Sequence, residues 1–73
     1  MIFAALLICW PHGCMPVADA ASPHATHADC AARLSVMQAV AAQGAPGARI
    51  RAVCGTLDEV RRATGAYQGE YAT

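Results

Sequence analysis

The chain begins with an unbroken apolar run, MIFAALLIC, that is closed by Trp10, Pro11 and Gly13. Such a run is typical of a strand covered on both faces, and it is too short for a membrane span, which needs roughly 20 apolar residues. A signal peptide is the alternative, because Ala18-Asp19-Ala20 fits a small-residue cleavage site. However, no Lys or Arg precedes the apolar run, so we predict a retained and buried first strand.

Residues 11–29 have the composition of a loop, with three of the four prolines and all three histidines. We expect these histidines to be solvated. A helix should follow, with Thr26 or Asp29 as its N-cap and Gly44 as a left-handed C-cap. Its apolar positions recur at helical spacing and predict one buried face: Cys30, Leu34, Met37 and Ala41.

Beyond the GAPG turn the pattern changes to the alternation of a half-buried strand. Ile50, Ala52 and Cys54 are apolar, whereas Arg49 and Arg51 between them are charged. Thr56 and Glu59 then have the spacing of a capping box for a short helix over 57–64, which Gly65 closes. The last residues, AYQGEYAT, are expected to be an exposed tail.

These elements predict a small α/β fold, a βαβ or ββαβ unit stapled by disulfides, with a short C-terminal helix and tail. We place the stapled unit at 1–55 and the helix and tail at 56–73. A right-handed βαβ crossover with parallel strands would bring all four cysteines to one end of the unit. A chain of 73 residues has a small core and generally needs such staples.

The four cysteines, Cys9, Cys14, Cys30 and Cys54, permit three pairings. We favour Cys30–Cys54, which ties the start of the helix to the end of the strand, and Cys9–Cys14 across the turn between them. A four-thiolate zinc site is the alternative, because Cys9 and Cys14 have a C-x4-C spacing near the wide end of zinc knuckles.

Charge and motifs narrow the function classes. Five Lys and Arg balance five Asp and Glu, so the chain has no electrostatic footprint for nucleic acid. The sequence has no phosphate-binding loop, no redox C-x2-C and no carboxylate pair suited to acid–base catalysis. We therefore expect a protein that is not an enzyme and that needs no cofactor.

Four segments give the chain a resemblance to a known type of protein: MIFAALLIC, the GC that ends at Cys14, DCAARL around Cys30, and RAVCG around Cys54. With these, residues 1–55 resemble small four-cysteine proteins encoded by phages and prophages of alphaproteobacteria. The resemblance implies a phage origin and four paired cysteines, and it implies no chemistry. Residues 56–73 fall outside it.

The expected function is that of a structural accessory protein bound to the subunits of a larger assembly, as a minor virion protein of the decoration or connector type. Its contacts are predicted on the C-terminal segment, at Leu57, Val60, Tyr67 and Tyr71. The alternatives are a secreted or periplasmic disulfide protein cleaved near Ala20, and a zinc-binding adaptor.

Overall fold

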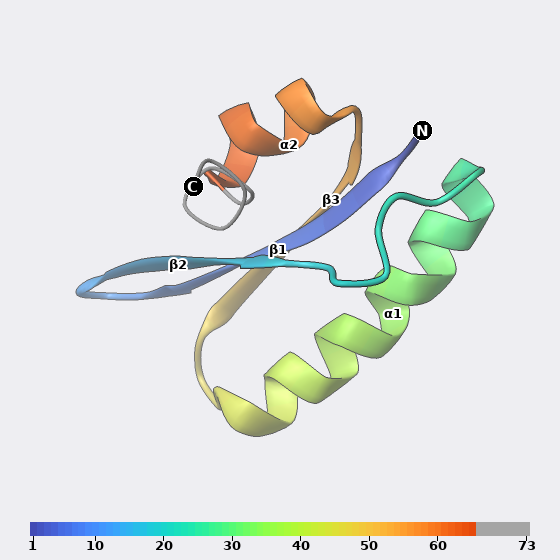
Figure 1. Cartoon of the computed structure of the whole chain (residues 1–73). Helices are drawn as coiled ribbons and strands as arrows, with labels where there is room; N and C mark the ends of the chain where they lie inside the picture. Colours follow the sequence, from blue (N-terminus) through green and yellow to red (C-terminus); the bar gives the residue numbers. More distant parts are fainter. Residues whose placement is uncertain (66–73) are drawn as a thin grey trace.

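A computed structural model of the chain describes residues 1–65. The elements follow in the order β1 (Phe3–Trp10), β2 (Gly13–Ala18), α1 (His27–Gly44), β3 (Arg49–Gly55) and α2 (Leu57–Thr64). The three strands form one sheet with β1 in the centre, in the order β2-β1-β3. The two helices cover opposite faces of this sheet (Figure 1). This confirms a small, disulfide-stapled α/β fold of the ββαβ type.

The predicted parallel crossover is wrong, because both strand pairs are antiparallel. The reason is the hairpin. β2 returns the chain to the starting end of β1, where Ala18 lies opposite Ala5, before α1 begins. The helix then runs along β1, and β3 returns in the opposite direction, so that Cys54 lies opposite Ala4. The four cysteines therefore lie at two ends of the sheet and do not converge.

The segment read as a loop contains β2, which carries Pro16. A backbone hydrogen bond from Asp19 N to the oxygen of Ala4 fixes which groups of β2 face β1. Since these groups alternate along an antiparallel strand, the backbone of Pro16 faces away from β1. Proline cannot donate a hydrogen bond to a neighbouring strand, so this outer edge is a position where a strand tolerates it.

The core has two parts, one on each face of β1. Ala4 and Leu6 pack against Cys30 and Leu34 of α1, and Met37 lies at the margin of this cluster. On the other face, Ala5 packs against Val60 of α2, and both are fully buried. β1 is thus the strand covered on both faces that its apolar run predicts.

The helix ends agree largely with the sequence. Thr26 caps α1 by accepting a hydrogen bond from the backbone N–H of Asp29. The capping box of α2 is present, with Thr56 and Glu59 bonded to each other in both directions, and Gly65 closes α2 with φ 74°. The expected left-handed cap at Gly44 is wrong, because α1 continues through Gly44 and the positive φ, 84°, falls on Gly47.

Candidate functional site

Two disulfides fasten the fold, Cys9–Cys14 and Cys30–Cys54, which are the pairs favoured from the sequence. Cys9–Cys14 joins two residues directly opposite each other in the β1–β2 hairpin. Cys30–Cys54 joins the buried first turn of α1 to the end of β3. All four thiols are thereby used, so none is left as a thiolate ligand for zinc. Among residues 1–65 no group of three or more His, Cys, Asp or Glu side chains could hold a metal ion.

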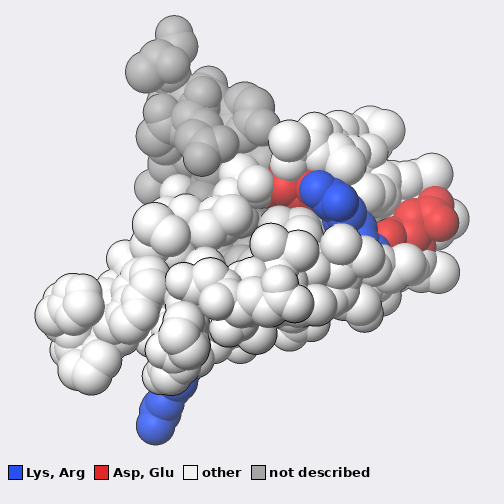
Figure 2. Space-filling model, turned by 90° about the horizontal axis from the view of Figure 1, so that it is seen from below, with Lys and Arg blue, Asp and Glu red and all other residues white. Residues whose placement is uncertain are grey.

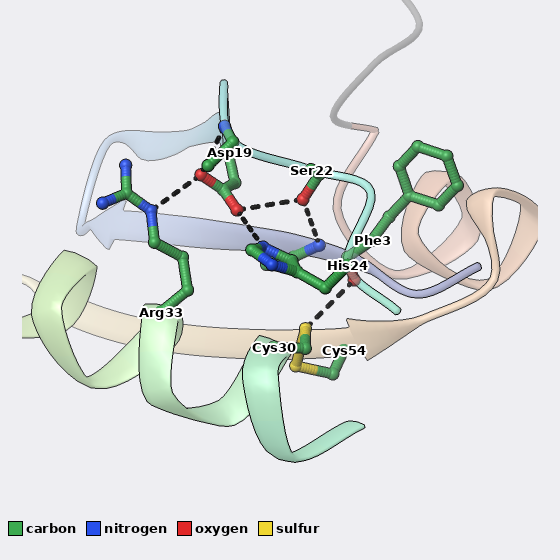
Figure 3. Close-up of polar contacts among 9 residues, drawn as sticks. Phe3, Asp19, Ser22, His24, Cys30, Arg33 and Cys54 are labelled. Atoms are coloured by element: carbon green, nitrogen blue, oxygen red, sulfur yellow. Dashed lines mark hydrogen bonds and ion pairs between the residues drawn. A yellow bond between two sulfur atoms is a disulfide. The ribbon is translucent and has the colours of Figure 1, made fainter. Parts of the chain in front are cut away.

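The segment between β2 and α1 holds a buried carboxylate, Asp19, that the sequence did not single out. Four hydrogen bonds from neighbouring groups converge on it (Figure 3). Arg33 Nε of α1 and the backbone N–H of Ala21 donate to Oδ1 at 2.9 and 3.0 Å. The Ser22 hydroxyl and His24 Nε2 lie 2.9 and 2.8 Å from Oδ2.

Two effects act on the ionisation of this carboxyl group. Burial is the larger single effect and raises the pKa of Asp19, whereas the hydrogen bonds from His24, Arg33, Ala21 and Ser22 lower it. Together these hydrogen bonds outweigh burial and hold the pKa of Asp19 at about 2. The carboxylate is therefore ionised at neutral pH and accepts only, so His24 Nε2 carries a proton in this contact.

The Asp19 cluster is a cross-link rather than a nucleophile and its base. The Ser22 hydroxyl donates to Asp19 and accepts from the backbone N–H of Ala4, so it is not aimed at an imidazole. Backbone hydrogen bonds also join His24 to Ile2 in both directions. The cluster therefore ties the connecting segment to β1 and, through Arg33, to α1. The expectation of solvated histidines is wrong for His24, whose side chain is only 14% exposed.

Beside this cluster an apolar groove of about 360 Å³ lies between α1 and the segment 17–20. Val36 and Val40, four residues apart on α1, form its exposed wall and are 55% and 64% exposed. Arg33 and Asp19 lie at its margin, where they neutralise each other. Figure 2 shows that the surface seen from this side is largely uncharged, with acidic and basic side chains next to each other in one region and a single basic side chain at the opposite edge.

The residues predicted to form an interface are placed differently. Val60 is fully buried against Ala5, and Leu57 packs beside it, so both contribute to the core under α2. Tyr67 and Tyr71 lie outside the described residues. The groove does not follow from the central apolar stripe of α1, because Val36 and Val40 lie beside that stripe. The i, i+4 pair Val36 and Val40 was the available signal.

No helix within residues 1–65 is long and apolar enough to cross a membrane. Two disulfides in so small a domain indicate an oxidising environment outside the cytoplasm. Comparison of the chain with protein-family models, curated proteins and solved structures gave no match.

Proposed function

We propose that the chain is a non-enzymatic structural accessory protein that docks on a subunit of a larger assembly, as a minor phage virion protein of the decoration or connector type. The groove between α1 and segment 17–20 carries this proposal. It exposes Val36 and Val40, and the charged pair among its described lining residues, Asp19 and Arg33, is neutralised within the chain. Such a groove suits an uncharged, apolar segment of a partner protein, and it offers no electrostatic attraction for nucleic acid.

The rigidity of the framework supports the same role. The Cys30–Cys54 disulfide anchors α1, and the Asp19–Arg33 contact joins the two walls of the groove, one on α1 and one on segment 17–20. A site that is ordered before binding loses less conformational entropy when the partner docks. The polar groups gathered at Asp19 satisfy one another, which favours a structural use over a catalytic one.

The secreted or periplasmic alternative depends on cleavage near Ala20. In the described fold, residues 1–20 supply β1, β2 and Asp19. A chain beginning after Ala20 would leave β3 without the strand that it pairs with and would lack one disulfide. We therefore favour a retained segment, since the described fold is built on it. The intact mass of the mature protein tests this, because loss of residues 1–20 would favour the alternative.

The docking test is co-sedimentation of the affinity-tagged full chain with particles from the cells that encode it. We expect a fixed ratio of the chain to the major particle subunit. Val36→Glu/Val40→Glu should abolish co-sedimentation, because each substitution places a charge on the groove wall. Ala39→Glu is the matched control, since Ala39 is exposed on the same helix outside the groove lining.

Two outcomes would refute the proposal. One is a wild-type chain found only in the particle-free fraction. The other is a folded double variant, verified by circular dichroism, that co-sediments as the wild type does.

A further inference from the structure

The outer edge of β3 carries backbone groups that no described residue pairs with. The backbone of Ala4 forms its hydrogen bond with the β2 side of the sheet. In an antiparallel sheet the direction alternates, so the neighbouring odd-numbered residues of β1, from Phe3 to Cys9, form their backbone hydrogen bonds with β3. Their partners in β3 are Gly55, Val53, Arg51 and Arg49. The N–H and C=O groups of the residues between them therefore point away from the sheet: Ile50, Ala52 and Cys54.

The two edges of the sheet differ in how they are protected. On β2 the outward positions include Pro16, which lacks an N–H and discourages further strand pairing. β3 has seven residues and no proline, so each of its outward-facing residues keeps an N–H donor. A free edge of this kind is a template for adding another strand.

We propose that two copies of this chain pair through their β3 strands, antiparallel and centred on Ala52. Ala52 is the middle residue of β3, so this register overlaps the full length of both strands. Outward-facing residues then bond to each other, with Ile50 opposite Cys54 and Ala52 opposite its own copy. The product is one six-stranded sheet with two-fold symmetry, in which each copy contributes the same surface.

Charge complementarity favours a second copy as the partner. In this register Arg49 of one copy lies opposite Gly55 of the other, where no side chain intervenes. The Glu59 side chain lies over Gly55, at 3.2 Å from the position a Cβ would occupy there. The hydrogen bond from the Thr56 backbone N–H to Oε1 lowers the pKa of Glu59, so this carboxylate is negatively charged beside Gly55. By symmetry, the Arg49–Glu59 pair forms twice.

The position of α1 allows the two β3 strands to pair. α1 packs on both β1 and β3, and neighbouring strands lie about 4.8 Å apart, so the two copies of α1 would run about 10 Å apart. This is a normal helix-packing distance. The flank of α1 opposite the groove faces the second copy, and several of its exposed residues are small: Ala31, Ser35 and Ala42. The net charge of zero adds no overall repulsion between copies.

Sedimentation equilibrium and amide hydrogen exchange on the purified, ¹⁵N-labelled full chain test the pairing. We expect a reversible dimer, with the Ile50, Ala52 and Cys54 amides protected above its Kd and exchanging rapidly below it. The amides of Arg51 and Val53, which face β1, are the internal control and should stay protected at both concentrations. A chain that stays monomeric at several hundred micromolar would overturn the proposal.

Substitutions distinguish this interface from other surfaces. Ala52→Pro removes an outward N–H without losing a bond to β1, and we expect it to be monomeric. Arg49→Ala should weaken the dimer about 10-fold, because two cross-strand ion pairs are lost. Arg51→Ala is the matched control on the same strand and face. Arg51 lies opposite Val53 and diagonal to its own copy, so its removal should leave the dimer as tight or tighter.

If Ala52→Pro fails to fold, two other variants test the interface: Arg49→Glu, and the double variant Arg49→Glu/Glu59→Gln. The single variant places two carboxylates together, and the double variant should recover part of the affinity while keeping the capping box. Pairing through β3 would be overturned by a dimer whose Kd is unchanged when Arg49 is substituted but which is lost in Val36→Glu/Val40→Glu. Co-sedimentation with the larger assembly is a separate readout, so either proposal can fail while the other stands.

Discussion

Arg33 Nε lies 2.9 Å from Oδ1 of Asp19, and this contact joins α1 to the segment that follows β2. The Asp19 side chain is fully buried, whereas that of Arg33 is 40% exposed. Removing the two partners should therefore have unequal effects. Asp19→Ala leaves buried donors without their acceptor and should destabilise the fold by about 3 kcal/mol or more. Thermal unfolding should show a fall in Tm of well over 10 °C.

Arg33→Gln is the comparison. Its exposed position lets water replace part of the contact, so we expect a loss of about 1 kcal/mol. An Asp19→Ala variant no less stable than Arg33→Gln would contradict the role given to the buried carboxylate.

The low pKa of Asp19 makes a prediction about acid stability. Its pKa falls from 3.8 to about 2 on folding, so the folded state binds this proton less tightly than the unfolded state does. The ionised Asp19 carboxylate therefore contributes about 2 kcal/mol to the free energy of unfolding. This contribution is complete above about pH 4 and is lost as the pH falls toward 2. Asp19→Asn should therefore flatten the dependence of the unfolding free energy on pH in this window. Urea unfolding between pH 5 and pH 2 measures the difference, and equal slopes for both proteins would contradict it.

Much of the fold could be predicted because several of its elements are determined by patterns of residues that are close together in the sequence. The apolar run that became β1, the stripe from Cys30 to Ala41 and the Thr56–Glu59 box each depend on neighbouring residues along the chain. The strand β2 was missed because its sequence, GCMPVA, shows no alternation and contains Pro16. Without β2, the predicted directions of α1 and β3 relative to β1 are the reverse of those in the structure. This reversal is the reason why the prediction places all four cysteines at one end of the sheet.

The Asp19 cluster could not be predicted for a different reason. Its members come from the end of β2, the connecting segment and α1, and only the tertiary fold brings them together. In the sequence, Asp19 lies between two alanines, a pattern that is typical of a signal-peptide cleavage site. His24 lies in a segment rich in small and polar residues, where solvation is the common outcome.

Leu6 tests the central position of β1. It is 1% exposed and packs in the cluster beneath α1. Leu6→Asp would bury an unpaired charge at a cost of several kcal/mol, so we expect no cooperative unfolding transition. Met15→Asp on β2 is the control, because Met15 is 47% exposed and its replacement should cost less than about 1 kcal/mol. A Leu6→Asp chain with native near-ultraviolet dichroism would show that this strand is not central.

The two disulfides should contribute unequally to stability. Cys30–Cys54 spans 24 residues of sequence, whereas Cys9–Cys14 spans 5. In the chain-entropy model, closing the longer loop stabilises the fold by about 3.5 kcal/mol and the shorter by about 2 kcal/mol. Cys30→Ala/Cys54→Ala also removes a buried sulfur from the core beside Leu34. We therefore expect its Tm to fall further than that of Cys9→Ala/Cys14→Ala.

Thiol labelling of the untreated protein provides the accompanying check, because every described cysteine is paired. Full reduction should lower the Tm by well over 10 °C, since a loss of about 3 kcal/mol or more is large for a chain of this size. Labelling of two or more thiols before reduction would contradict the pairing. Equal Tm values for the two double variants would show that loop length and burial do not set the contribution of each bond.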